Sequence, residues 1–221
     1  YGALDGRGAA YVVFGSATLH TVGTVNLSSP TGLVKVFGMN PGVHSGIAVS
    51  AGDLNGNGYD DLIIGAPDGG PSYRSGSGEV NVIFGDLTFR DRGTMYLGSF
   101  PVINTIRVYG ASASEHVGGA IAAGDANGDG RDELVIGARS AAPAGRSDAG
   151  TAYVLPGAAN LHLRGTIDLA DTSFTASRIR GSSAGNSAGA AVGAGDVNGD
   201  GFHDVLVGSP FADPAGRGDA G

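Results

Sequence analysis

A nine-residue segment rich in aspartate, asparagine and glycine occurs three times in this chain. The copies are Asp53–Asp61, Asp125–Glu133 and Asp196–Asp204, and their first residues lie 72 and 71 residues apart. A long, constant period is typical of arrays in which each unit packs against its neighbours. We therefore interpret residues 1–221 as a single repeat domain built from copies of one structural unit.

Each segment places oxygen-bearing side chains at positions one, three, five and nine, with glycine at positions four and six. A hard cation such as Ca²⁺ takes six to eight oxygen ligands, and glycine allows the tight backbone turns that aim several oxygens at one point. The pattern predicts three Ca²⁺ sites, with the backbone carbonyl of position seven as a further ligand. The predicted ligands are Asp53, Asn55, Asn57, Tyr59 and Asp61 in loop one, Asp125, Asn127, Asp129, Arg131 and Glu133 in loop two, and Asp196, Asn198, Asp200, Phe202 and Asp204 in loop three.

Two alternatives to these sites can be weighed from the residues. An EF-hand needs a bidentate glutamate at position twelve, where this chain has Ile64, Ile136 and Val207. A metal-free turn of Asp, Asn and Gly is the other alternative, and three copies in phase favour metal instead. Loop one has Asn57 where the other loops have aspartate, so we expect it to bind Ca²⁺ most weakly. The expected role of the metal is structural, because each loop gathers carboxylates that repel one another.

Composition limits the remaining possibilities. The net charge is −8, and ten of the 21 acidic residues lie inside the three loops. Bound Ca²⁺ would account for most of that charge, and without a basic patch we expect no nucleic-acid partner. The chain has no cysteine, so disulfides cannot stabilise it. No apolar run reaches the length of a membrane span.

The residues around each loop predict four short strands per unit. An opening strand is followed by a strand of small residues, then the loop, then an apolar strand that we expect to be buried on both faces. A third type of strand comes after a variable turn. Four such strands predict a β-propeller blade, so the expected fold is all-β with repeat 1 at 33–104, repeat 2 at 105–176 and an incomplete repeat 3 at 177–221. Residues 1–32 are expected to supply outer strands that complete a blade.

Three blades are too few for a closed ring, since closed propellers typically have about four to eight. Two explanations stay open. The chain is a segment of a longer propeller, or it associates with itself, in which case a dimer would give six blades.

The residues that flank each loop resemble the FG-GAP repeat of integrin α-subunit propellers and their bacterial relatives. A Gly-Ala-Pro motif is expected twelve residues after the first Asp, and the sequence has Gly65-Ala-Pro67, Gly137-Ala-Arg139 and Gly208-Ser-Pro210 there. Where the family has Phe-Gly, this chain has Ser45-Gly46, Val117-Gly118 and Ala188-Gly189, so the glycine is kept and the aromatic is not.

This resemblance implies a secreted or cell-surface, calcium-stabilised propeller that acts as a protein- or glycan-binding adhesion module. The alternative that it implies is a non-catalytic accessory domain of a secreted hydrolase or polysaccharide lyase. In either case we expect no catalytic residues and no enzyme activity in this chain.

Three other patterns have simpler interpretations. Arg217-Gly218-Asp219 spells an integrin-ligand tripeptide, but the equivalent place in the previous unit is a similar turn. Gly181–Gly185 matches G-x-S-x-G, which works as a nucleophile elbow only between a strand and a helix. His44 and His116 occupy the same place in successive units and are interpreted as turn residues.

Overall fold

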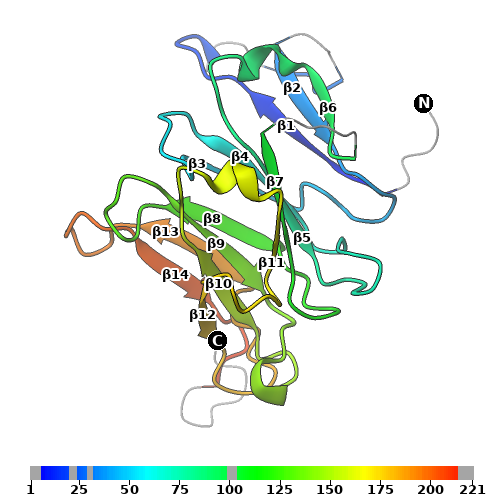
Figure 1. Ribbon diagram of the computed structural model, residues 1–221, viewed down its shortest axis with the longest axis vertical. Helices are drawn as coiled ribbons and strands as arrows, with labels where there is room; N and C mark the ends of the chain where they lie inside the picture. Colours follow the sequence, from blue (N-terminus) through cyan, green and yellow to red (C-terminus); the bar gives the residue numbers. More distant parts are fainter. Residues whose placement is uncertain (1–5, 20–23, 29–31, 99–103, 214–221) are drawn as a thin grey trace.

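The computed structural model describes residues 6–19, 24–28, 32–98 and 104–213, and this part of the chain is all-β. Within these residues, fourteen strands form four sheets that follow one another along the molecule (Figure 1). The described residues include three short 3₁₀ segments, Phe89–Arg92 (η2), Pro143–Gly145 (η3) and Leu161–Arg164 (η4). None of the described helices has the length and apolar character needed to cross a membrane.

Two complete four-stranded blades form the middle of the molecule. In each blade, the small-residue strand pairs antiparallel with the apolar strand, and the apolar strand pairs antiparallel with the third strand. The opening strand of the following repeat completes the sheet. Each complete blade therefore contains strands from two of the repeats that the sequence predicted. The first blade contains β3 (Ala48–Gly52), β4 (Asp61–Ala66), β5 (Glu79–Ile83) and β7 (Thr105–Tyr109), and the second contains β8 (Ala120–Gly124), β9 (Glu133–Ala138), β10 (Thr151–Leu155) and β12 (Ser177–Arg180).

Half blades lie at the two ends of the molecule. One half blade has the two outer strand types of a blade, β1 (Ala9–Val13) and β2 (Leu33–Phe37). The other has the two inner strand types, β13 (Ala191–Gly195) and β14 (Asp204–Gly208). Figure 1 shows β1 and β2 at one end of the molecule and β13 and β14 toward the other. The described sheets thus form consecutive propeller blades without closing a ring, as the repeat count predicted.

Two three-residue strands were not predicted. β6 (Thr94–Tyr96) pairs in parallel with β2, and β11 (Thr166–Asp168) pairs in parallel with β7. Each lies in the segment that follows the third strand of one blade. Each caps the preceding blade, which means that it pairs with the outermost strand of that blade. Such short segments show no recognisable alternation of polar and apolar residues, which is why the sequence pattern did not reveal them.

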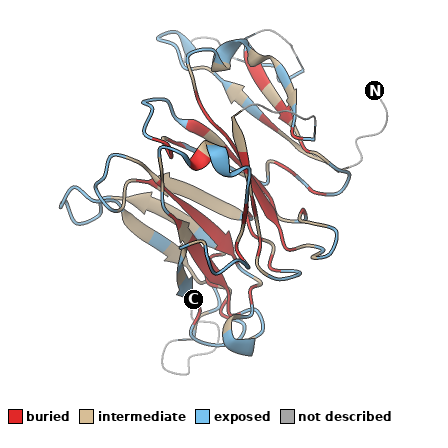
Figure 2. Ribbon diagram, viewed as in Figure 1, coloured by how far each residue is buried: buried red, intermediate tan, exposed pale blue. Residues whose placement is uncertain are grey.

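Burial follows the predicted pattern in the complete blades. Five of the six residues of β4 and all six of β9 are buried, as expected for an apolar strand covered on both faces. Figure 2 shows the buried residues running through the centre of the molecule, with intermediate and exposed residues on β13 and β14. The prediction of full burial is wrong for β14, because neither a third strand nor a following blade covers it in the described structure.

Adjacent blades meet glycine to glycine. A Cβ placed on Gly65 would lie 1.9 Å from the carbonyl oxygen of Gly118, and one on Gly137 would lie 2.1 Å from that of Gly189. Gly118 and Gly189 also have positive φ angles of 88° and 83°, which favour glycine. The two glycines of the FG-GAP pattern therefore touch each other across the blade interface, and this contact does not need the aromatic residue that the chain lacks.

The innermost strands are equally crowded, as their small residues predicted. A Cβ on Gly52 of β3 would come within 2.5 Å of the Ala123 Cβ on β8. One on Gly124 would come within 2.8 Å of the Ala194 Cβ on β13. Since ordinary carbon contacts are about 3.5–4.0 Å, larger residues could not be accommodated without separating the blades.

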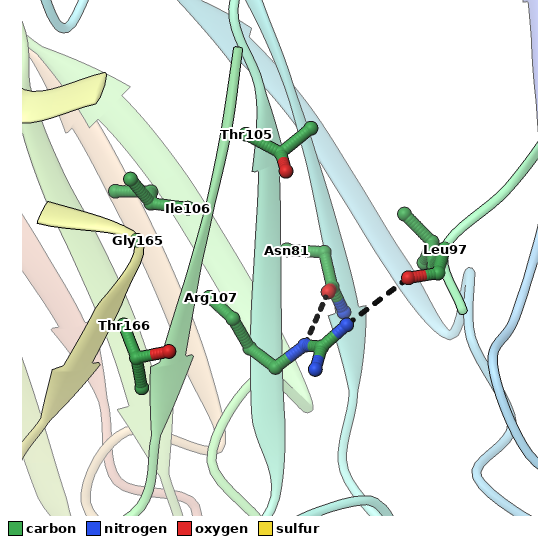
Figure 3. Close-up of a pocket in the computed structure, with 7 residues that line it drawn as sticks. All are labelled: Asn81, Leu97, Thr105, Ile106, Arg107, Gly165 and Thr166. Carbon is green, nitrogen blue, oxygen red and sulfur yellow. Dashed lines mark hydrogen bonds between the residues drawn. The ribbon is translucent and has the colours of Figure 1, made fainter. Parts of the chain in front are cut away.

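A cavity of about 130 Å³ lies between the sheet of β1, β2 and β6 and the first complete blade (Figure 3). Arg107 points across it, donating from Nε to the Asn81 side-chain oxygen at 3.1 Å and from a terminal nitrogen to the Leu97 carbonyl at 3.1 Å. These bonds tie β7 both to its neighbour β5 and to the linker after β6. The cavity is thus part of the joint between two sheets.

Candidate metal loops

The three loops share one backbone arrangement, built around the aspartate at position one. Asp125 accepts N–H bonds from Gly128 at 2.7 Å and Asp129 at 3.2 Å on one oxygen, and from Gly130 at 2.9 Å on the other. Asp53 and Asp196 repeat this pattern. The bonds require the glycines at positions four and six, all of which have positive φ angles.

The charge at position one is stabilised by these bonds. For Asp125, desolvation raises the pKa, but the N–H groups of Gly130 and Gly128 outweigh it and leave the pKa below its ordinary value. The pKa of Asp196 is also lowered, chiefly by the Gly201 N–H. Both side chains are therefore ionised at neutral pH, as a Ca²⁺ ligand must be.

Positions three and five continue the turn. The Asn127 side-chain oxygen accepts the Asp129 N–H at 2.8 Å, and Asp129 accepts the Arg131 N–H at 3.0 Å. Loops one and three have the same two bonds. Carbonyl and carboxylate oxygens have a second lone pair, so these bonds leave each oxygen able to bind a cation.

The acid at position nine closes each loop. Asp61, Glu133 and Asp204 accept the N–H of position two at 3.0, 2.9 and 2.9 Å. In the two complete blades the same acid also accepts an N–H from the end of the third strand. Gly85 donates to Asp61 at 2.9 Å, and Gly157 donates to Glu133 at 3.4 Å. Asp204 has no such second contact within the described residues.

The surroundings of position nine favour a cation. Burial raises the pKa of Asp61 to about 7; N–H bonds from Gly85 and Leu54 lower it, and repulsion from Asp53 and Asp60 raises it further. Burial likewise raises the pKa of Glu133, and nearby Asp129 and Asp125 add to the shift. A divalent ion would neutralise the carboxylates that repel one another.

The donor set fits Ca²⁺ rather than a transition metal. It consists of carboxylate and amide oxygens, the ligand types that hard cations prefer. No group of three or more His, Cys, Asp and Glu side chains arranged for a metal occurs in the described ranges. The candidate loops instead mix acids with asparagine and backbone oxygens. The carbonyls of Tyr59, Arg131 and Phe202 remain predicted ligands.

Position eight connects one loop to the next, which the sequence did not reveal. Asp132 accepts the Asp53 N–H at 2.9 Å on its side chain, and its own N–H donates to the Asp53 carbonyl at 3.0 Å. In the next pair, His203 donates its N–H to the Asp125 carbonyl at 2.9 Å. The loops therefore form a chain of contacts along one end of the blades.

The turns at the opposite ends of the strands border a groove of about 490 Å³. Glu115 is buried there and accepts the Ala111 N–H at 2.9 Å and the Tyr153 hydroxyl at 3.4 Å. Burial raises the pKa of Glu115, and N–H bonds from Ser112 and Ala111 partly offset the rise. The Arg178 guanidinium lies 5.4 Å from the centre of the Tyr153 ring and donates to the Leu169 carbonyl.

The remaining motifs behave as turns. His44, His116 and Ser187 have positive φ angles of 52°, 55° and 54°, which supports the interpretation of this position as a turn. Both histidines approach Asp68, His44 at 2.7 Å and His116 at 3.6 Å.

The other two sequence matches carry no site in the described structure. Gly181–Gly185 connects β12 to β13, so no helix follows it and it is not a nucleophile elbow. Arg217-Gly218-Asp219 lies outside the described residues.

Consecutive four-stranded blades, each with an oxygen-rich loop between its two inner strands, define a segment of the β-propeller class. Residues 45–83, 117–155 and 188–221 match the FG-GAP repeat. The chain belongs to the FG-GAP repeat family.

Curated relatives show the same repeats in larger proteins. The chain is 30% identical to Integrin alpha-PS2 of Drosophila melanogaster over 186 residues, which are 81% of this chain and 11% of the relative. It is 30% identical over 181 residues to phosphatidylinositol-glycan-specific phospholipase D of Mus musculus and 31% identical over 183 residues to that of Bos taurus. These matches cover 80% of this chain and 20% of each phospholipase.

Proposed function

We propose that this chain is a calcium-stabilised, extracellular propeller segment that binds a protein or glycan ligand and does not catalyse a reaction. The observation that carries the calcium proposal is the repeated oxygen-rich loop, with the same hydrogen bonds in all three copies. Membership of the FG-GAP family and similarity to an integrin α subunit support the binding role and the extracellular location.

In this proposal Ca²⁺ holds the hairpin between the two inner strands of each blade. The position-one aspartate is oriented by its N–H bonds, and the acid at position nine, which is buried in loops one and two, supplies further negative charge that a cation would balance. Without disulfides, each loop would depend on the ion for its rigidity. We therefore expect the free energy of unfolding to rise with Ca²⁺ concentration.

Calorimetric titration of the chelator-treated chain tests this proposal. Three Ca²⁺ equivalents are expected, with one lost in each of the variants D53A, D125A and D196A. Asp91→Ala is the matched control, because Asp91 lies in η2 outside the loops. Absence of Ca²⁺ binding by the folded chain, or unchanged stoichiometry in the three variants, would refute the calcium sites.

The ligand face in this proposal is the end opposite the metal loops. The turns at residues 67–78 and 139–150 border it and differ in sequence, whereas the loops keep the same ligand pattern. Variable turns on a constant scaffold are the usual place for specific recognition. A glycan or protein array probed with the chain, and with a variant in which the 139–150 turn is replaced by the 67–78 turn, tests it. Binding unaffected by the exchange would contradict this face.

A second candidate is an accessory domain of a secreted hydrolase or lyase. The similarity to three phosphatidylinositol-glycan-specific phospholipases D from mammals supports it, because this chain matches only 20% of each enzyme. In that case the chain would position a catalytic domain located elsewhere. Co-purification with such a domain, without ligand binding by the chain alone, would favour this candidate.

A further inference from the structure

Asp132 links the first two metal loops. It occupies position eight of loop two, between the predicted ligands Arg131 and Glu133. Its side chain accepts the N–H of Asp53, at position one of loop one, at 2.9 Å, and its own N–H donates to the Asp53 carbonyl at 3.0 Å. Both backbone groups of a predicted ligand of loop one are therefore held by a residue that stands between two predicted ligands of loop two.

A second series of hydrogen bonds joins the acids at position nine. Leu54, which is fully buried, donates its N–H to Asp61 at 3.0 Å, and its carbonyl accepts the N–H of Ala158 at 2.9 Å. The neighbouring Gly157 donates its N–H to Glu133 at 3.4 Å. The position-nine acids of loops one and two thus lie at the two ends of one short series of hydrogen bonds.

The loops also pack directly against each other. A Cβ placed on Gly56, at position four of loop one, would lie 3.0 Å from Cγ of Arg131, at position seven of loop two. A Cβ on Gly128 would lie 2.5 Å from the Phe202 ring in the next pair of loops, whereas one on Gly58, at position six, would meet nothing within 4 Å. Position four of loops one and two therefore faces position seven of the following loop, and Figure 1 shows the β3–β4 and β8–β9 hairpin loops on the same side of the molecule.

These contacts connect the ordering of one loop to the ordering of the next. When an ion orders loop one it fixes Asp53, and through Asp132 it also restricts the end of loop two. A loop that has already lost conformational freedom loses less of it on binding its own ion, so it binds that ion more tightly. The two ions repel each other, but at exposed loops salt screens this repulsion over a length of about 8 Å at physiological ionic strength. The expected net coupling is therefore favourable.

We propose that loops one and two bind Ca²⁺ cooperatively, with Asp132 as the positioning residue that couples them. This coupling rests on the proposed calcium sites, which it makes dependent on each other. Because coupling between two binding sites is reciprocal, each loop raises the affinity of the other by the same factor. The expected factor is about five or more, the lower end of typical coupling between sites.

Tyr59 allows the occupancy of loop one to be measured separately. It stands at position seven of loop one, where loops two and three have Arg131 and Phe202. Tb³⁺ is a hard cation that binds oxygen ligands as Ca²⁺ does, and it luminesces when a nearby tyrosine is excited. The tyrosine-excited signal of the chelator-treated chain therefore reports the ion in loop one, and Tyr59→Phe should abolish it.

Tb³⁺ titrations compare loop one in chains with loop two intact and disabled. Asp125→Ala removes position one of loop two and keeps every predicted ligand of loop one, and it should weaken Tb³⁺ binding at loop one about fivefold or more. Asp196→Ala is the matched control, because it disables loop three, in which His203 donates to loop two. Its effect on loop one should be much smaller. Circular dichroism verifies that each chain is folded.

The titrations distinguish a failure of the calcium sites from a failure of the coupling. Absence of Tb³⁺ and Ca²⁺ binding by the folded, unaltered chain would refute both. Normal binding by the unaltered chain, with the same loop-one affinity in Asp125→Ala, would refute the coupling alone. Equal losses in Asp125→Ala and Asp196→Ala would also refute it, because the effect would then not depend on contact between the loops.

Two substitutions of Asp132 test its role as the link. Asp132→Asn keeps a side-chain oxygen that can accept the Asp53 N–H, whereas Asp132→Ala removes it. Adding Asp125→Ala should still weaken binding at loop one by a similar factor in the asparagine chain, and by a much smaller factor in the alanine chain. Asp60→Ala, at position eight of loop one, is the control and should leave the coupling unchanged. Full coupling in the Asp132→Ala chain, or equal loss of coupling in both Asp132 variants, would refute this hydrogen bond as the link.

Discussion

Gly65→Ala tests the glycine contact between blades. The added Cβ would lie 1.9 Å from the Gly118 carbonyl oxygen, whereas real contacts need about 3 Å or more. The second blade must therefore move by roughly 1 Å or more, which costs about 1–3 kcal/mol in overpacking. Any shift of Gly118 relative to the rest of its own blade also strains its N–H bond to the Gly137 carbonyl, 3.1 Å long, a loss of about 1 kcal/mol.

A smaller favourable effect offsets part of this cost, because alanine restricts the unfolded chain by about 0.4–1 kcal/mol. The net expectation is a destabilisation of about 2–3 kcal/mol, measured by urea unfolding in Ca²⁺ buffer at low protein concentration. Gly208→Ala is the matched control, since the nearest atom that its Cβ would meet is the Ala191 Cβ, at 3.3 Å. Its expected cost is within about 1 kcal/mol. Equal costs for the two variants would refute the argument.

The remaining predictions concern the loops and the buried acid. Asn57→Asp should raise the Ca²⁺ affinity of loop one toward that of the other loops in calorimetric titration, because affinity rises with ligand charge; unchanged affinity would contradict the ligand assignment. Asp132→Ala should lower the free energy of unfolding by about 1–2 kcal/mol, because it removes the acceptor of the Asp53 N–H. Asp60→Ala, at the same position of loop one, should lower the free energy of unfolding by less in the same urea-unfolding assay. Burial raises the pKa of Glu115 above its ordinary 4.5, so the stability linked to its proton is complete below pH 4.5 and is lost as pH rises through the raised value. Glu115→Gln should remove this part of the pH dependence in urea unfolding, and an unchanged profile would show that Glu115 does not titrate as described.

The sequence predicted the elements that depend on strong local patterns. Continuous apolar runs such as Leu62–Gly65 and Leu134–Gly137 became strands covered on both faces in the complete blades. The small-residue strands became the crowded inner strands. The period also predicts a blade split between the two ends of the chain; β1–β2 and β13–β14 belong to separate sheets in the described structure, so this stays a prediction.

Elements that depend on contacts between units could not be predicted in the same way. β6 and β11 have only three residues each, and their conformation is set by the β2 and β7 edges that they cap. The link between Asp132 and Asp53 joins residues 79 positions apart, so no local pattern indicates it. Only an alignment of the repeats with one another would have indicated Gly85 and Gly157, whose N–H groups donate to the position-nine acids of the first two loops.

The direct contact between glycines has a consequence for how such proteins change in size. Since this contact between blades is made of backbone atoms of glycines that every unit possesses, it needs no matched pair of side chains when units become neighbours. A unit could therefore be duplicated or lost by recombination without a compensating substitution at this contact.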